Sequence, residues 1–299
     1  MKGILLMAYG SPRNLEEIEQ YYTHIRRGRR PSKEELNELV KRYKAIGKSP
    51  LYDITVNQAK KLQEKLFKMK SNTKVFYAMK HSEPFIDKVV QQVVNEDIKD
   101  LLCIVLAPHY SQESVETYFK IVKENVSRLG KEIRVEFVKH WYEYEKFIYA
   151  WVRRIKEVEE KIGPNNWLVF SAHSLPERIL TIKDPYVEQL NESCQLIAKK
   201  LNRNDWSFSF QSAGKTNDKW LGPDLIEHLE ELYKNGKNKI IIAPIGFVSD
   251  NLEILYDIDI ECKSWAKNIG LTLERCRMLN DDDDFIDCLV DITKNYDFI

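Results

Sequence analysis

A histidine at the end of an apolar run and three evenly spaced carboxylates are the residues of this chain best suited to chemistry. His173 directly follows Val169-Phe-Ser-Ala, a run typical of a buried strand. Glu253, Asp257 and Glu261 are spaced by four, which places them on one face of a helix. Neutral imidazole accepts protons and binds transition metals, and carboxylates bind hard cations. Together they predict ligand and base chemistry for a divalent metal.

Both features have ordinary structural alternatives. A lone histidine is most often a structural residue with paired nitrogens, and acids at helical spacing most often form a solvated helix face. Apolar residues surround these acids, however, namely Leu252, Ile254, Leu255, Tyr256, Ile258 and Ile260. Like charges four residues apart on a helix cost roughly 0.2–0.5 kcal/mol per pair. We therefore expect a partly buried acidic track that holds or relays a hydrated cation.

A cluster of arginines forms a candidate site for anions. Arg26, Arg27, Arg29 and Arg30 are close in sequence, and Arg42 follows one predicted helix later. Such a run can be a solvated helix end, because cations stabilise helix C-termini. It can equally bind carboxylates in bidentate geometry. The acidic run 281–284, by contrast, is expected to be a solvated helix N-terminus.

Composition excludes several classes of protein. The 299 residues are 43% hydrophobic, which is sufficient for one large or two medium domains. Lysine plus arginine equals aspartate plus glutamate at 46 each, so a nucleic-acid binder is not expected. No stretch approaches the roughly 18 apolar residues that span a membrane. We expect a cytoplasmic monomer, associated with membranes only peripherally if at all.

The five cysteines are scattered and include no C-x-x-C pair. This pattern suits reduced thiols and predicts neither a structural zinc site nor an iron–sulfur cluster.

Short apolar runs alternate with amphipathic stretches along the whole chain. The expected strands are residues 3–8, 74–80, 101–107, 133–138, 167–172, 206–211, 239–245 and 271–275. Helical periodicity is clearest in Glu16–Arg27, Lys33–Ile46, Val56–Met69 and Glu145–Lys161. This alternation predicts an α/β fold with parallel sheets and helices on both faces.

Eight strands divide naturally into two Rossmann-like halves, each a four-stranded, mainly parallel sheet flanked by helices. The predicted halves are residues 1–145 and 146–299, with the last helix packing back on the first half. A single (β/α)8 barrel is the alternative, because it also needs eight strands. Ligands of open α/β sheets bind beyond the carboxyl ends of the strands. Tyr9, His81, His109 and His173 follow strands one, two, three and five, and we expect them near the site.

The order of motifs along the chain resembles that of the ferrochelatases, most closely the Gram-positive type that acts on coproporphyrin III. The resemblance runs nearly end to end. In its first half the motifs are Leu6-Met-Ala-Tyr9-Gly-Ser-Pro12, Tyr21-Tyr-Thr-His-Ile-Arg26-Arg-Gly-Arg29, Arg42-Tyr-Lys-Ala-Ile-Gly47, Ser49-Pro-Leu51, Lys80-His81-Ser-Glu-Pro-Phe85 and Leu106-Ala-Pro-His109-Tyr-Ser111. In its second half they are Ser171-Ala-His173-Ser-Leu-Pro176, Trp220-Leu-Gly-Pro-Asp224 and Gly246-Phe-Val-Ser-Asp250 with the acidic segment.

The resemblance implies insertion of Fe²⁺ into coproporphyrin III, giving coprohaem for haem b biosynthesis. It makes His173 and Glu253 the catalytic and metal-site pair, and Tyr9 an axial ligand on the opposite side of the macrocycle. Asp257 and Glu261 match an outer site that could hold Mg²⁺. The residues matching porphyrin contacts are Tyr9, Arg26, Arg27, Arg42, Tyr43, Ser49 and Tyr118, with Lys80 and His81 as secondary candidates. No prosthetic group is implied, and a downstream haem-pathway enzyme is a potential partner.

Two departures from the family pattern bear on the site. Asn251 stands where the family usually has histidine, and Lys219 where it tends to have proline before the Trp-Leu motif. These changes concern efficiency and metal preference more than reaction class. Three alternatives stay open: a protoporphyrin IX ferrochelatase, a chelatase for another tetrapyrrole such as sirohydrochlorin, and a haem or coprohaem carrier without activity.

Overall fold

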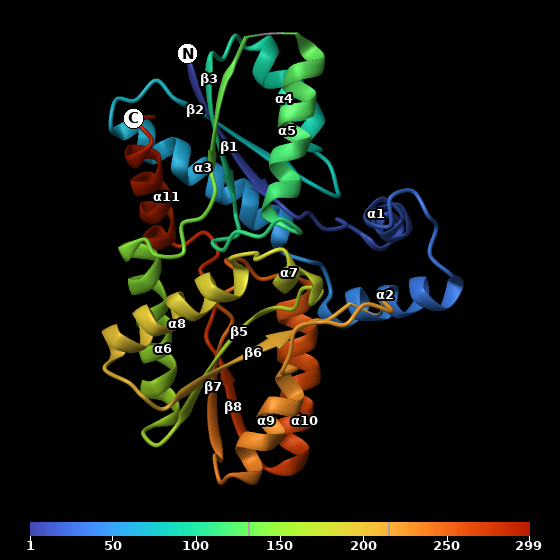
Figure 1. Ribbon diagram of the computed structural model, residues 1–299, viewed down its shortest axis with the longest axis vertical. Coiled ribbons are helices and arrows are strands. Elements are labelled where there is room, and N and C mark those ends of the chain that lie inside the picture. The colour runs from blue at the N-terminus through green and yellow to red at the C-terminus, as the bar shows by residue number, and fades with distance from the viewer. Residues whose placement is uncertain (131, 215) are drawn as a thin grey trace.

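Two four-stranded parallel sheets form the framework of the protein (Figure 1). A computed structural model describes residues 1–130, 132–214 and 216–299. The first sheet, in the order β2-β1-β3-β4, contains β1 (Lys2–Ala8), β2 (Lys74–Met79), β3 (Asp100–Val105) and β4 (Arg134–Val138). The second, in the order β6-β5-β7-β8, contains β5 (Trp167–His173), β6 (Trp206–Gln211), β7 (Lys239–Ala243) and β8 (Thr272–Arg275).

The α/β prediction is confirmed, and the eight expected strands are present with ends that differ by at most two residues. The barrel alternative is wrong, because the strands form two separate sheets and β4 does not pair with β5. In each sheet the first strand in sequence lies between the second and the third. That order creates a switch point beside β1 and another beside β5, where the connections leave in opposite directions.

Helices fill the connections between the strands. In the first half they are η1 (Leu15–Glu17), α1 (Ile18–Ile25), α2 (Lys33–Ile46), α3 (Leu51–Lys68), α4 (Ile86–Asn95) and α5 (Val115–Leu129). In the second half they are α6 (Glu145–Ile162), α7 (Arg178–Thr181), α8 (Tyr186–Leu201), α9 (Leu225–Lys234), η2 (Glu253–Cys262), α10 (Lys263–Ile269) and α11 (Asp283–Asn295).

Two helix predictions need correction at their ends. The stretch Glu16–Arg27 is a 3₁₀ turn followed by α1, which ends at Ile25 because Arg27 and Gly28 adopt positive φ angles of 56° and 86°. Helix α3 begins at Leu51, five residues before the predicted start. Its first turn includes a hydrogen bond of 2.9 Å from the Ile54 N–H to the carbonyl of Pro50.

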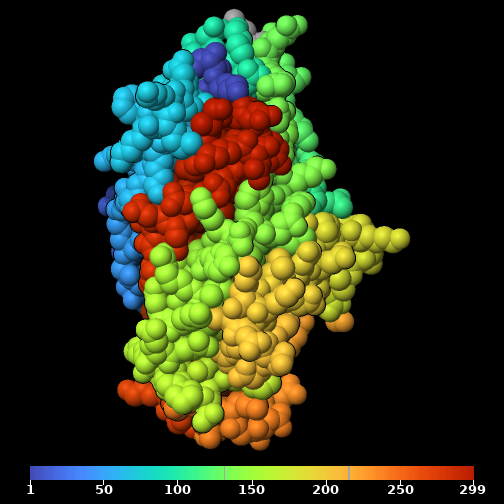
Figure 2. Space-filling view, turned by 90° about the vertical axis from the view of Figure 1, so that its left-hand side faces the viewer, coloured from blue at the N-terminus to red at the C-terminus, as the bar shows by residue number. Residues whose placement is uncertain are grey.

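The main hydrophobic core runs through both halves of the molecule. It includes Ile4 of β1, Leu62 of α3, Trp151 of α6, Phe170 of β5 and Leu289 of α11. Helix α11 packs against both α3 and α6. Figure 2 shows this C-terminal helix in red, seated between residues of the first half and of α6. Because α11 touches both halves, the core does not fix a boundary, and the division near residue 145 stays a prediction.

The acidic run 281–284 is not the solvated helix end that we predicted. Arg154 of α6 is fully buried and donates hydrogen bonds of 2.8 Å to Asp282 and 2.7 Å to Asp284. Asp281 forms an ion pair of 2.9 Å with Lys61 of α3. These acids therefore attach the start of α11 to both halves, through partners more than a hundred residues away in sequence.

Candidate active site

His173 lies at the end of β5 with one ring nitrogen already engaged. Its Nδ1 is 2.6 Å from the carbonyl oxygen of Ser174, which can only accept a hydrogen bond. Nδ1 must therefore carry a proton, so in the neutral imidazole Nε2 has a free lone pair. The Tyr186 hydroxyl donates to the His173 carbonyl at 2.9 Å and fixes the strand end. The ring is thus held in the tautomer that a base or metal ligand requires.

The loop after β7 lies directly against the end of β5. The Gly246 N–H donates to the carbonyl of Ser171 at 3.2 Å. A Cβ at Gly246 would be 2.5 Å from the Ala172 Cβ, so only glycine permits this approach. Next in the loop, the ring of Phe247 has its centroid 6.2 Å from that of His173. The same loop then leads to Glu253, the first residue of η2.

Segment η2 is a π-helix, whereas the sequence predicted ordinary helical winding. π-Helical hydrogen bonds run between residues five apart, so acids spaced by four do not form a straight stripe along it. Asp257 has only 15% of its side chain exposed, while Glu261 is exposed. Asp259, which the prediction did not include, accepts hydrogen bonds of 3.0 and 2.6 Å from Arg275. The acidic track is therefore buried in its middle and open at its far end.

Glu253 lies close to tyrosines of the first half. After burial, its negative charge is a cause of the raised pKa values of Tyr9 and Tyr43, and it also raises that of Tyr21. These hydroxyls are therefore neutral at physiological pH. No hydrogen bond or ion pair engages the Glu253 carboxylate within residues 1–130, 132–214 and 216–299. The carboxylate is thus available to a cation.

Asp257, one turn further along, is already partnered. Its carboxylate accepts a hydrogen bond from Ser212 and another, of 3.2 Å, from Nη1 of Arg42. Burial raises the pKa of Asp257 to about 6, the Ser212 hydrogen bond and Arg42 oppose this, and Glu253 adds to it. Asp257 therefore changes its charge close to neutral pH.

Tyr9 and His81 lie side by side at the ends of β1 and β2. Their ring centroids are 4.5 Å apart, and the Nδ1 atoms of His81 and His24 are 3.0 Å apart. Tyr9 is 41% exposed, yet burial by the surrounding protein, followed by the charge of Glu253, raises its pKa. Burial, with Lys80 and His24, lowers the pKa of His81 to about 3. His81 is thus a neutral neighbour of Tyr9.

Lys80 is the basic group of this region. It donates a hydrogen bond of 2.6 Å to Thr117 and lies 4.8 Å from the centre of the Tyr118 ring. Burial, together with the charge of Arg27, lowers the pKa of Lys80 to about 8. It therefore remains mostly protonated at neutral pH.

The other residues matched to porphyrin contacts differ in their exposure and in whether their polar groups already have partners. Arg26 forms an ion pair of 2.6 Å with Glu35, whereas Arg27 is exposed. Tyr43 and Ser49 are buried, and the hydroxyl of Ser49 has no hydrogen-bond partner among the residues that the structure describes. A buried hydroxyl without a partner is unusual in a folded protein and suits a group that receives a ligand.

His109 is a core residue and does not belong with these side chains. It is 2% exposed, its ring stacks on Tyr142, and its Nε2 is 2.8 Å from the Ser193 hydroxyl of α8. The expectation that every histidine at a strand end lies near the site is therefore wrong for this residue. Within the described parts of the chain, no group of three or more His, Cys, Asp or Glu residues has metal-binding geometry.

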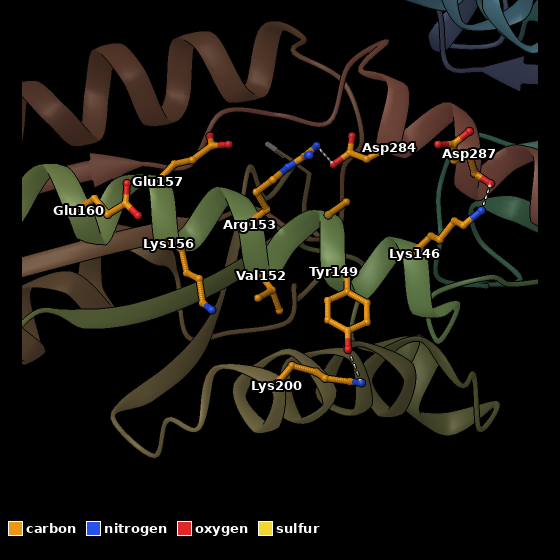
Figure 3. A pocket seen from close by; sticks show the side chains of 11 residues that line it. Lys146, Tyr149, Val152, Arg153, Lys156, Glu157, Glu160, Lys200, Asp284 and Asp287 are labelled. Atoms are coloured by element: carbon orange, nitrogen blue, oxygen red, sulfur yellow. Dashed lines mark hydrogen bonds and ion pairs between the residues drawn. The ribbon is translucent and has the colours of Figure 1, made fainter.

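Figure 3 shows a surface pocket of about 610 Å³ that shares no residue with the predicted site. Two of its basic side chains already have partners: Arg153 pairs with Asp284, and Lys200 donates a hydrogen bond of 3.0 Å to the Tyr149 hydroxyl. This pocket therefore lies apart from the residues predicted to form the site.

The contacts of three side chains near the site were not predicted from sequence. Ser212 donates to Asp257, and Asn280 holds Asp250 through two hydrogen bonds. The side chain of Asn251, the departure from the family pattern, accepts the Ile254 N–H at 2.9 Å and so caps the first turn of η2. No local pattern reveals the contacts of Ser212 and Asn280, because each depends on a residue of another loop, whereas the Asn251 contact is a local cap.

Comparison with known proteins shows what the whole chain is similar to. Residues 1–296 match the family profile described as "Ferrochelatase". The "Coproporphyrin III ferrochelatase" of Bacillus mycoides (strain KBAB4) is 44% identical over 298 residues, covering 97% of this chain and 96% of the relative. The "Coproporphyrin III ferrochelatase" of Anoxybacillus flavithermus (strain DSM 21510 / WK1) is 43% identical over 302 residues, covering 98% and 96%.

Solved structures show that the fold is also found in more distant proteins. The sirohydrochlorin chelatase SirB of Bacillus subtilis subspecies spizizenii, solved in complex with cobalt, superposes with a TM-score of 0.61 at 13% identity. The match covers 99% of this chain and 95% of that one. At such low identity, the likeness concerns the fold alone. No helix within the described residues is long and apolar enough to cross a membrane.

Proposed function

Because the chain belongs to the ferrochelatase family, we propose that it inserts Fe²⁺ into coproporphyrin III to give Fe-coproporphyrin III, the coprohaem of haem b biosynthesis. The observation that carries this proposal is the nearly full-length match to relatives that bear the name coproporphyrin III ferrochelatase. In the reaction, bonds from iron to the pyrrole nitrogens replace two N–H bonds. Both protons leave, and the oxidation state of iron does not change.

His173 is the base that we propose for these protons. Its Nδ1 donates to the Ser174 carbonyl, which leaves Nε2 as the acceptor. The imidazolium formed on proton uptake keeps the same hydrogen bond, so the ring does not need to turn between the two states. A base that is already oriented removes part of the entropic barrier of proton transfer.

Glu253 is the carboxylate that we propose for the iron. It has no partner to displace among the described side chains, and its charge favours replacement of water around a divalent cation. The neutral tyrosines Tyr9, Tyr21 and Tyr43 near it do not compete for the cation by charge. Tyr9 is proposed as an axial ligand of the product iron on the opposite side of the macrocycle.

We assign the porphyrin carboxylates to basic and hydroxyl side chains of the first half of the molecule. Arg27 is exposed, Lys80 is mostly protonated at neutral pH, and Ser49 offers an unpaired hydroxyl. Coproporphyrin III carries four propionates and protoporphyrin IX carries two. The more anionic substrate therefore gains more from these contacts. Arg26, Arg42, Tyr43 and Tyr118 complete the proposed porphyrin contacts.

The outer acidic site is proposed to bind a hydrated cation such as Mg²⁺ through Asp257 and Glu261. Asp257 is engaged by Arg42 and Ser212, whereas Glu261 is exposed. A cation there would keep most of its water, as Mg²⁺ commonly does in proteins. The cytoplasmic location, the monomeric state and a downstream partner enzyme stay predictions.

An anaerobic metallation assay tests the proposed reaction. The protein is incubated with Fe²⁺ and either coproporphyrin III or protoporphyrin IX, and the porphyrin absorbance bands are followed. We expect metallation of both porphyrins to be detectable and a higher kcat/KM for coproporphyrin III. A higher kcat/KM for protoporphyrin IX would reverse the substrate assignment. Tight binding of metalloporphyrin without metallation of free porphyrin would indicate a carrier.

Replacement of His173 by alanine tests the base. We expect the metallation rate to fall by about 10²-fold or more, while porphyrin binding, measured by fluorescence quenching, persists. His140→Ala serves as a matched control, because His140 lies outside the proposed site and is partly exposed. A His173→Ala rate equal to that of the wild type, with porphyrin bound, would exclude the proposed role.

A further inference from the structure

Asn280 connects two loops that are far apart in sequence. It lies between β8 and α11, and its backbone N–H donates to the carbonyl of Val248 at 2.8 Å. Its side-chain oxygen accepts the Asp250 N–H at 2.8 Å, and its side-chain nitrogen donates to the Asp250 carboxylate at 2.7 Å. Asn280 thus holds both the backbone and the side chain of Asp250, whose carboxylate also forms an ion pair of 3.3 Å with Arg275.

The same residue is held from the first half of the molecule. Gln58 of α3 is fully buried, and its amide nitrogen donates 2.7 Å to the Asn280 carbonyl and 3.1 Å to the Ser249 hydroxyl. Helix α3 therefore contacts both loops through one amide group. Position 280 has a φ of 48°, a left-handed conformation that asparagine tolerates better than most residues.

The segment 248–250, which Asn280 holds, is followed directly in sequence by the turn that carries the proposed metal ligand Glu253. Asp250 is followed by Asn251, whose side chain caps the first turn of η2, and Glu253 is the first residue of that helix. The orientation of the Glu253 carboxylate therefore depends on where residues 248–251 are held. Glu253 itself forms no hydrogen bond or ion pair with the described residues that could hold it in their place.

We propose that Asn280 is a positioning residue for metal delivery, which holds the 248–251 segment against α3 and so sets the place of the Glu253 carboxylate. This inference rests on the proposed role of Glu253 toward Fe²⁺. It assigns no contact between Asn280 and the iron or the porphyrin. Asn280 acts only through the two side-chain hydrogen bonds to Asp250 and the backbone contacts to Val248 and Gln58.

Asn280→Gly is the sharpest test, because glycine adopts the positive φ and keeps the backbone hydrogen bonds while it removes both side-chain bonds. We expect the KM for Fe²⁺ to rise about tenfold, because two hydrogen bonds that fix the loop are lost. The dissociation constant for coproporphyrin III, measured by fluorescence quenching, should stay within about twofold. Asn202→Gly is the matched control, because Asn202 has a φ of 54° and is exposed at the end of α8.

A charge exchange separates positioning from general support of the fold. Asn280→Asp places two carboxylates against each other and should raise the KM for Fe²⁺ further than Asn280→Gly. The double variant Asp250→Asn with Asn280→Asp restores one donor and one acceptor across the pair, and should recover most of the lost apparent affinity. General support of the fold would be restored by the same exchange, so thermal stability is measured beside the KM for Fe²⁺: a positioning role predicts that the KM for Fe²⁺ changes and recovers while the melting temperature and porphyrin binding stay close to those of the wild type.

The results for Asn280→Gly decide the inference. An unchanged KM for Fe²⁺ overturns it. A rise in KM that is accompanied by equal losses of porphyrin binding and thermal stability overturns it too. Glu253→Gln is measured alongside: if it alters the KM for Fe²⁺ while Asn280→Gly does not, only the positioning role fails. If Glu253→Gln has no effect on the rate or on the KM, the proposed role of Glu253 fails first, and the positioning role fails with it.

Discussion

Nη1 of Arg42 on α2 donates a hydrogen bond of 3.2 Å to Oδ1 of Asp257 on η2, across 215 residues of sequence. The same guanidinium binds Glu38 at 3.3 Å and lies 4.9 Å from the centre of the Tyr256 ring. An arginine that we matched to the porphyrin is therefore also the counter-charge of the acidic segment. This double position links the ionisation of Asp257 to a residue of the other half of the molecule.

Replacement of Arg42 by glutamine should shift the pH dependence of kcat/KM for Fe²⁺. Burial raises the pKa of Asp257 to about 6, and Arg42 opposes this by stabilising the ionised form. Asp257 thus gains its charge as the pH rises through about 6. Without Arg42 its pKa rises further, because the positive charge that stabilises the carboxylate is lost. We expect the acid limb of kcat/KM for Fe²⁺ to move to higher pH.

The measurement uses saturating porphyrin, because Arg42→Gln also removes a proposed porphyrin contact. Arg134→Gln provides the control, since Arg134 forms its ion pairs at the exposed edge strand β4. An acid limb in the same place as in the wild type would show that Asp257 does not govern iron use.

Two adjacent arginines on α6 should differ strongly in their contribution to stability. Arg154 is fully buried between Asp282 and Asp284, whereas Arg153 binds the same Asp284 with 54% of its side chain exposed. Arg154→Ala removes a fully buried partner, which typically costs about 3–5 kcal/mol. Arg153→Ala breaks an exposed pair, worth roughly 0–1 kcal/mol. The free energies of unfolding are measured by urea titration of both variants.

The two variants control each other, because they share a partner, a helix and a substitution. Equal losses of stability in Arg153→Ala and Arg154→Ala would mean that burial does not decide the strength of this ion pair. The comparison also tests the corrected view of the 281–284 run, because a solvated helix end would make both changes mild.

The sheets could be predicted from sequence because their information is local. Most strands are short runs rich in apolar residues, so their positions follow from the local sequence pattern. The end of a strand is local too, and for that reason the amino-acid pattern around His173 predicts its place at the end of β5.

Contacts between residues that are far apart in the sequence could not be predicted in the same way. Arg275 of β8 forms ion pairs with Asp259 of η2 and with Asp250 of the loop before it. The burial of Arg154 depends on acids near the other end of the chain. His109 has the sequence context of a site residue but occupies a stacked core position. Each case needs a long-range contact that a local pattern does not encode.

The buried histidine His109 should make stability depend on pH. Burial and the nearby His140 lower the pKa of His109 to about 3, whereas an unfolded histidine has a pKa near 6.5. Below pH 6.5 the unfolded chain therefore takes up a proton that the folded chain does not. The stabilisation is complete above about pH 6.5 and is lost as the pH falls toward 3. At pH 5 the expected loss from this group is about 2 kcal/mol.

His109→Gln removes this contribution, while the amide can still donate a hydrogen bond to Ser193. We expect the difference in unfolding free energy between pH 7.5 and pH 5 to be smaller in the variant by about 2 kcal/mol. Burial lowers the pKa of His81 in the same direction, so part of the pH dependence should remain. Identical pH dependence in variant and wild type would contradict the assignment of His109 as a neutral core residue.

Gly246→Ala should reduce activity by displacing the loop that connects the two proposed catalytic residues. A methyl group at this position would lie 2.5 Å from Cβ of Ala172 and 2.9 Å from its Cα, closer than real side chains approach. Backbone of β5 cannot move aside easily, because it pairs with both β6 and β7. The loop must therefore shift away from the strand end, and Glu253 shifts relative to His173. A displacement of about 1 Å at reacting groups can cost about 10²-fold in rate.

The decisive measurement for Gly246→Ala is kcat for iron insertion together with the dissociation constant for coproporphyrin III. The residues proposed to contact the porphyrin carboxylates, such as Arg27 and Lys80, lie in the first half and do not depend on this loop. We therefore expect kcat to fall while porphyrin binding changes little. Full activity in this variant would mean that the loop tolerates the shift, and that a fixed relation between His173 and Glu253 is not needed for metallation.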